Sequence, residues 1–180
     1  MKSLHGSTVT PFAAIPVIMA LALGISGSRT FAEDLPRETV LPLTLAAQAA
    51  MGALDKCKAD GYQVSVAVVD RSGRIKALFR GDGAGPHTLN SSRKKAYTAA
   101  SMRRPTSEFA QLITQMPAIQ GLRDMDPEIL ILGGGLPILL DGEVIGGIGV
   151  GGAPGGHLDD ACAEAGLKSI GAAIKSPKKE

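Results

Sequence analysis

The 180 residues suffice for one ordinary domain. With 44% hydrophobic and 20% charged residues, the composition excludes an intrinsically disordered chain, and with only 3% aromatic residues the core must be a close packing of small aliphatic side chains. The formal net charge is +2, but two basic residues, Lys2 and Arg29, lie within residues 1–32, whereas all 17 acidic residues lie after residue 32. The remainder is therefore neutral, which removes the electrostatic basis for a nucleic-acid partner.

Residues 1–32 are typical of a secretory signal peptide. An apolar run at 11–28 is followed by the small residues Thr30 and Ala32, at the −3 and −1 positions of a cleavage site after Ala32. A membrane anchor is the alternative, but the run is shorter than the ~20 residues that a spanning helix needs, and Pro16 interrupts it. We therefore expect a periplasmic or secreted protein with no membrane attachment after cleavage.

The domain itself is expected to cover residues 43–175, between a loose arm at 33–42 and a solvated tail at 176–180. Its first helix is predicted to begin after Pro42, since apolar residues recur on one helical face, and to end at Gly61, a typical C-terminal cap. The next two segments, VSVAVVD and RIKALFR, favour strands, and the RSG between them is typical of a hairpin turn.

A glycine-rich loop, GDGAGPH, leads into the predicted helix LNSSRKKAYTAASMRR, which Pro105 is expected to end. A shorter helix, TSEFAQLITQM, follows. The segments ILILGG, LPILLDG and EVIGGIGVGG are each predicted to be strands, and the Asp141-Gly142 pair favours a hairpin between the last two. LDDACAEAGLKSIGAAI is expected to be the final helix. This order indicates an α+β domain with a five-stranded, largely antiparallel sheet.

The stretch GIGVGG, residues 147–152, matches the dinucleotide-binding pattern G-x-G-x-x-G. That pattern requires a position after the first strand of a parallel unit and an acidic residue ~20 residues later. Here it ends the last predicted strand, so we interpret the glycines as positions where backbone, a ligand or another subunit packs closely. No nucleophile elbow, zinc-protease motif or phosphate loop occurs, and an enzymatic role is not indicated.

Two histidines, His87 and His157, remain after cleavage, and each lies in a glycine-rich loop that leads into a helix. An imidazole is a common ligand of haem and transition metals, whereas a loop histidine is often only a surface residue. After His87, Arg93 and Tyr97 share one helix face, and the helix N-terminus favours an anion. Such a set could hold a planar ligand with carboxylates. The alternative is a solvated cationic face.

The two cysteines, Cys57 and Cys162, each lie on the apolar face of a predicted helix. In an oxidising compartment such a pair tends to be bridged, and two buried free thiols are the alternative. Their spacing matches neither a zinc site nor a redox CxxC motif.

The segment VAVVDRSGRIKALFRGDGAGPHTLNSSRKKAYTAASMRRPT resembles the signature of the GlcG/HbpS-like family, which includes the C-terminal domain of PduO-type proteins. GGGLPI, DGEVIGGIGVGGAPGG and DDACAEAG continue the resemblance, over about residues 41–174. The resemblance implies a profilin-like α+β fold, with a five-stranded antiparallel sheet flanked by helices, and homo-oligomers, octamers among them. It also implies haem binding by some members, with exported members proposed to bind or sense haem outside the cytoplasm.

Carried over to this chain, the resemblance implies that His87 and Thr88 bind haem, with Arg93 and Tyr97 behind them. His157 departs from the family pattern, which is acidic there, and is either an accessory metal ligand or a chance change. The second axial ligand stays open among four side chains: Thr88, Tyr97, Met102 and Met116. Related sequences also carry the cysteines, and a Cys57–Cys162 bridge is possible if the first and last helices pack side by side, with Cα atoms within roughly 7 Å.

Two other functions stay open for the same loop. In the first, the loop and Arg93 hold a small carboxylate instead of haem, in a binding protein or in an enzyme that uses neutral His87 as a base. In the second, the protein is a structural oligomer whose loop closes an interface. A haem titration distinguishes the first function, in which no haem binds, from haem binding. The second function predicts that His87→Ala changes the oligomeric state and leaves ligand affinity unchanged.

Overall fold

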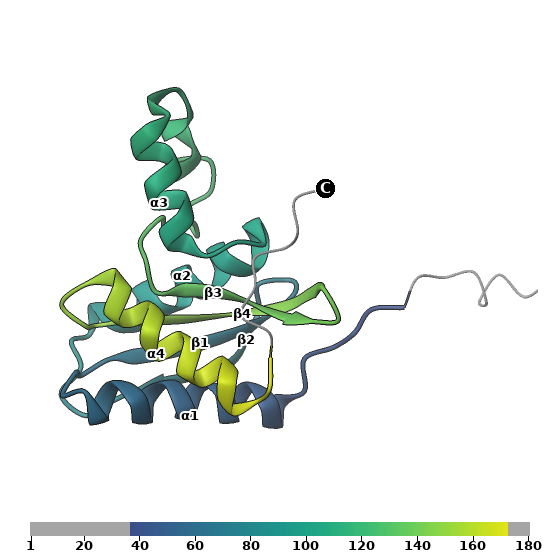
Figure 1. The fold of residues 1–180 in the computed structure, drawn as a ribbon, viewed down its shortest axis with the longest axis vertical. Coiled ribbons are helices and arrows are strands. Elements are labelled where there is room, and N and C mark those ends of the chain that lie inside the picture. The colour runs from purple at the N-terminus through teal and green to yellow at the C-terminus, as the bar shows by residue number, and fades with distance from the viewer. Residues whose placement is uncertain (1–36, 173–180) are drawn as a thin grey trace, which may run out of the picture. The chain divides into compact units, whose positions relative to one another are not determined.

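Four antiparallel strands form one sheet in the order β2-β1-β4-β3. Their bounds are Ser65–Asp70 for β1, Ile75–Arg80 for β2, Gly135–Leu140 for β3 and Glu143–Gly151 for β4. Two hairpins, β1-β2 and β3-β4, meet where β1 pairs with β4 at the centre of the sheet (Figure 1). The β3-β4 turn confirms the Asp141-Gly142 prediction, because both residues have positive φ, at 50° and 87°.

Helices cover both faces of this sheet. The computed structural model describes residues 37–172, so the predicted signal peptide at 1–32 and the tail at 176–180 lie outside the described residues. One face is covered by α1 and α4, the other by α2, while α3 and the 3-10 helix η2 project from the sheet (Figure 1). Their bounds are Leu43–Ala59 (α1), His87–Met102 (α2), Thr106–Gln115 (α3), Pro117–Arg123 (η2) and Gly156–Ser169 (α4). None of the helices described is both long and apolar enough to cross a membrane.

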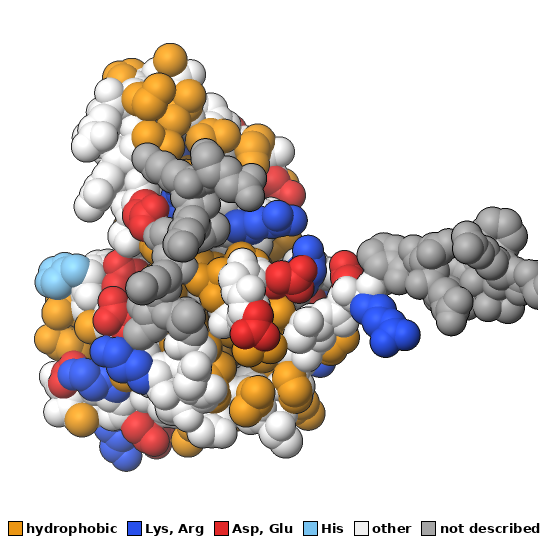
Figure 2. All heavy atoms as spheres, turned by 45° about the vertical axis from the view of Figure 1, so that its right-hand side comes forward, with side chains coloured by type: hydrophobic (Ala, Val, Ile, Leu, Met, Phe, Trp, Pro, Cys, Tyr) orange, Lys and Arg blue, Asp and Glu red, His pale blue; other side chains and the backbone are white. Residues whose placement is uncertain are grey.

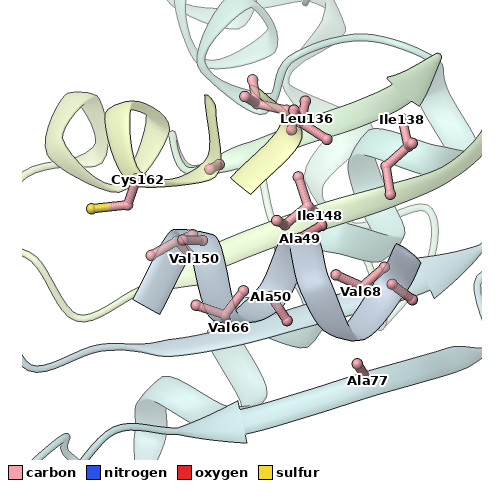
Figure 3. Packing of buried hydrophobic residues seen from close by; sticks show 14 of the residues in the cluster. Ala49, Ala50, Val66, Val68, Ala77, Leu136, Ile138, Ile148, Val150 and Cys162 are labelled. Atoms are coloured by element: carbon pink, nitrogen blue, oxygen red, sulfur yellow. The ribbon is translucent and has the colours of Figure 1, made fainter. Parts of the chain in front are cut away.

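The larger core lies between the sheet and the α1–α4 pair (Figure 3). Alternate side chains of the central strands point to this face, among them Val66 and Val68 of β1 and Ile148 and Val150 of β4. Each such buried aliphatic side chain stabilises the fold by about 1.5–3 kcal/mol. The contact face of α1 is made largely of alanines, so the helix lies close to the strands.

A disulfide between Cys57 and Cys162 joins α1 to α4, with the two Cα atoms 5.5 Å apart. The two helices run antiparallel and side by side, and at their other end the Gln48 side-chain amide donates a hydrogen bond to the carbonyl of Ser169 (2.6 Å). The predicted bridge is therefore confirmed. It joins the last turn of α1 to the middle of α4.

On the other face, α2 packs on β4 through backbone atoms. A Cβ built on Gly149 would lie 2.1 Å from the carbonyl oxygen of Ser92, and one built on Gly147 would lie 2.3 Å from that of Ala96. No side chain fits in either position. The glycines of GIGVGG are therefore explained by close backbone packing, as the sequence analysis proposed, and not by a dinucleotide.

We predict that Gly149→Ala lowers the free energy of unfolding by at least about 1–3 kcal/mol, because the added methyl group forces α2 away from β4. Gly121→Ala is the matched control, since a Cβ there meets nothing within 4 Å. Urea denaturation of both variants measures the effect. Equal stability of the two would mean that the helix and strand are not in backbone contact.

The predicted strand at ILILGG is wrong, and the sheet has four strands instead of five. Residues 129–134 form an irregular connection to β3. Helix side chains bind part of its backbone: the Leu130 N–H donates to Thr98 Oγ1 (2.8 Å) and the Gly134 N–H to Asp160 Oδ1 (2.6 Å). The Gly134 carbonyl accepts from the Val150 N–H of β4 (2.8 Å), next to the start of β3. The other predicted helices and strands are present within a few residues of their expected bounds.

Candidate functional site

His87 is the first residue of α2 and lies at the end of the sheet where β1 begins and β4 ends. Its side chain is exposed and folds back over the preceding loop. A Cβ on Gly85 would lie 2.6 Å from Cε1 of His87, so only glycine leaves room for the imidazole in this position. The glycine-rich loop thus has a direct role in placing the ring.

The imidazole lines a hollow of about 290 Å³ that three loops enclose. The residues that line it with His87 and Thr88 are Gly61, Tyr62, Gln63, Gly83, Gly85, Gly152 and Pro154. Thr88 is almost fully buried, and its hydroxyl shares a hydrogen bond with Ser65 Oγ (2.7 Å) and donates one to the Gly85 carbonyl (2.6 Å). Thr88 therefore lines the same hollow as His87, and its hydroxyl is engaged in holding the loop.

A second hollow of about 450 Å³ adjoins the first and shares the wall Gly61–Gln63 with it. Its lining combines the apolar groups of Met51, Leu54 and Tyr62 with the cations Lys58 and Arg80. Sequence reasoning missed this hollow, because it is formed by the outer face of α1 and the end of β2, which carry no recognisable motif.

Arg93 and Tyr97 lie further along α2 and contact the loop before β3. Arg93 forms an ion pair with Glu128, and the Tyr97 hydroxyl donates to Asp126 Oδ2 (3.3 Å). Burial raises the pKa of Tyr97, and the Asp126 carboxylate raises it further. Neither side chain lines either hollow, since Tyr97 is about 15 Å along the helix axis from His87. The structure therefore separates these two residues from His87 and Thr88.

The ion pair between Arg93 and Glu128 predicts that the stability of the fold decreases slightly at acid pH. The hydrogen bond from Arg93 holds the pKa of Glu128 below its ordinary value, so the pair stabilises the fold above about pH 4.5 and this contribution is lost as the pH falls through the folded-state pKa. Both side chains are partly exposed, which limits the effect to less than about 1 kcal/mol. We expect Glu128→Gln to be less stable than the native chain near pH 7, and this difference to shrink as the pH falls below about 4.5. Urea denaturation at pH 7 and at successively lower pH values measures the difference, and a difference that stays constant would contradict the prediction.

His157 lies exposed in the first turn of α4 and repeats the geometry of His87. A Cβ on Gly155 would lie 2.7 Å from its Cε1 atom, so this ring also folds back over a glycine. It lines neither hollow. The candidate ligands Met102 and Met116 lie at the end of α2 and directly after α3, and neither lines either hollow.

A buried ion pair between Lys95 and Asp159 holds the loop between β4 and α4, which lines the His87 hollow with Gly152 and Pro154. Lys95 Nζ lies 2.7 Å from Asp159 Oδ2 and donates to the Val150 carbonyl (2.9 Å), and both charged side chains are nearly inaccessible. Asp159 Oδ1 accepts the N–H of Ala153 (3.1 Å). Burial raises the pKa of Asp159, while Lys95 and the backbone donors lower it. The pair therefore holds the β4-α4 loop, which carries Gly152 to the hollow.

Residues 41–168 match the family model described as haem degrading protein HbpS-like. The chain belongs to the HbpS-like family. A structure of a double mutant of Streptomyces reticuli HbpS is 39% identical, with a TM-score of 0.71, and the match covers 92% of this chain and 99% of that one. This membership confirms the resemblance found in the sequence.

Two further relatives of this family cover smaller parts of the chain. The structure of a PduOC:heme complex is 25% identical, with a TM-score of 0.70, over 76% of this chain and 99% of that one. Protein GlcG of Escherichia coli K12 is 32% identical over 96 residues, which are 53% of this chain and 69% of GlcG.

Proposed function

We propose that this HbpS-like protein binds haem outside the cytoplasm, as a homo-oligomer, with His87 as an iron ligand. The observation that carries the proposal is the exposed imidazole of His87 on a hollow, in a family with a relative solved as a heme complex. Of the other candidate ligands, Tyr97, Met102 and Met116 line neither hollow. The Thr88 hydroxyl is engaged with Ser65 and the Gly85 carbonyl, so His87 is the residue that would hold the iron in this hollow.

The residues present fit a haem. An imidazole nitrogen is a usual ligand of haem iron, which supplies the capacity to bind small ligands or transfer electrons when the group is held. The His87 hollow alone is at the lower limit of drug-sized ligand sites, but the adjoining hollow of about 450 Å³ offers apolar side chains against which a macrocycle can pack. His157 lines neither hollow and is proposed only as an accessory metal ligand.

Export and assembly rest on separate observations. The predicted signal peptide supports a periplasmic or secreted location. Assembly is supported by exposed apolar side chains on and after the projecting α3–η2 segment, among them Met116, Met125 and Leu132, each at least half exposed. Figure 2 shows apolar side chains gathered on this segment. Such patches mark contact surfaces, and light scattering of the purified protein tests the expected oligomer.

We expect haemin added to the purified protein to give a saturable shift of the Soret band that His87→Ala abolishes or weakens at least about tenfold, because loss of the imidazole removes an iron ligand. His157→Ala is the matched control and is expected to retain the shift, since its ring has the same geometry but lines neither hollow.

Three results would change this proposal in different ways. No Soret shift with the native protein would exclude haem binding. An equal shift in native protein and His87→Ala would retain haem and exclude His87 as its ligand. A changed oligomeric state of His87→Ala with unchanged haemin affinity would indicate that the loop closes a subunit interface.

A further inference from the structure

The charged side chains of the larger hollow point to a role in recognising the ligand's carboxylates. Lys58 and Arg80 line this hollow together with Asp55 and Asp82. Yet neither cation forms an ion pair with any residue in the described range 37–172. Lys56, two residues before Lys58 on the same helix, does not line the hollow and is by contrast paired with Asp60. The two cations are thus available to a bound anion.

Arg80 is held in place by the loop that carries His87. Its Nε and Nη2 atoms both donate hydrogen bonds to the Ala84 carbonyl, at 2.8 and 2.6 Å. A guanidinium has five N–H donors, so three remain for another acceptor. Because the group is already oriented, little side-chain entropy is lost when it binds a carboxylate.

The two hollows are close enough for one planar ligand to extend across both. They share the wall Gly61–Gln63, and the side chain of Gln63 lies over Gly83, where a Cβ would be 2.7 Å from it. Gln63 is exposed, so its side chain can rotate away within nanoseconds. With the iron at His87, the rest of the macrocycle would extend over Tyr62 toward the cations.

We propose that Lys58 and Arg80 bind the carboxylate side chains of the tetrapyrrole whose iron His87 ligates. This inference rests on the proposed haem function and adds a specificity to it: the protein selects tetrapyrroles with free carboxylates over their esters. Lys58 contributes an ammonium group on a flexible side chain from α1. Arg80 contributes a planar guanidinium, already oriented by its hydrogen bonds, from the end of β2.

The test compares haemin with haemin dimethyl ester, both supplied in the same non-ionic detergent and followed at the Soret band. Lys58→Gln is expected to weaken haemin binding about fivefold and to leave the affinity for the ester unchanged, because an exposed charge pair contributes up to about 1 kcal/mol. Lys56→Gln is the matched control on the same helix and should affect neither ligand. Arg80→Lys keeps the positive charge but not the paired N–H donors of the guanidinium. It is therefore expected to lower the affinity for haemin less than Arg80→Gln does.

The outcomes separate this inference from the proposed function. Native affinity of Lys58→Gln and Arg80→Gln for haemin, or equal losses for haemin and ester, would overturn the carboxylate role while haem binding by His87 stands. No binding of haemin by the native protein would overturn both.

Discussion

Lys95→Met is expected to lower the free energy of unfolding by about 3–5 kcal/mol, one of the two largest effects that the structure predicts for a local change. The substitution leaves the Asp159 carboxylate buried with only backbone N–H donors, since its charged partner 2.7 Å away is lost. Asp159→Leu should be equally harmful, because the Lys95 ammonium would then retain only the Val150 carbonyl. Urea denaturation of both variants measures the loss.

The double variant Lys95→Met/Asp159→Leu makes this prediction specific. Replacing both charges by apolar groups removes the unpaired charge, so most of the lost stability should return, with a coupling energy of several kcal/mol. Lys56→Met removes an exposed pair with Asp60 as a control and should change stability by less than about 1 kcal/mol. Additive losses in the double variant would show that the two charges do not interact.

Loss of the Cys57–Cys162 disulfide is expected to lower the free energy of unfolding by about 2–5 kcal/mol. The bond closes a loop with a sequence separation of 105 residues, so it strongly restricts the unfolded chain. Both sulfur atoms belong to fully buried residues, and alanine substitution also removes their packing between α1 and α4. Urea denaturation of the double variant Cys57→Ala/Cys162→Ala, compared with the native protein, measures the combined loss of the covalent bond and of the sulfur packing.

Dithiothreitol provides the control for this second prediction. Added before denaturation, it should shift the native protein toward the stability of the double variant and leave the double variant unchanged. The bond also bears on the site, because the Tyr62 N–H donates to the Cys57 carbonyl (2.8 Å) and Tyr62 lines both hollows. Haemin affinity of the double variant should therefore fall along with its stability. Identical denaturation of native protein with and without the reductant would contradict the prediction.

Most of the fold could be predicted from the sequence, because its signals are local. Apolar residues at helical spacing predict α1, and Asp141-Gly142 predicts the β3-β4 hairpin. The error at ILILGG has an equally physical cause. A short apolar segment is compatible with a strand, but its backbone groups here are bound by side chains such as Thr98, which a local pattern does not report.

The site was predicted only in part, because it is assembled from loops distant in sequence. His87 and Thr88 are proposed from the sequence and line one hollow, but Lys58 and Arg80 belong to other elements and carry no motif. The cationic run after His87 contained a usable signal that was missed. Lys95 follows Ser92 by three residues on the buried face of α2, so helical spacing marks it as the inward-pointing cation.

The backbone contact between α2 and β4 has a consequence for the kinetics of ligand uptake. Because Gly147 and Gly149 bring α2 into close backbone contact with β4, sliding or rolling of the helix would break this packing. We therefore expect the Cα atom of His87 to keep its position relative to the sheet when a ligand binds. Only the imidazole torsions, the loop before them and Gln63 are left to adjust. Such motions take nanoseconds to microseconds, faster than rigid-body helix displacements. Association should therefore follow single-step kinetics that depend linearly on haemin concentration.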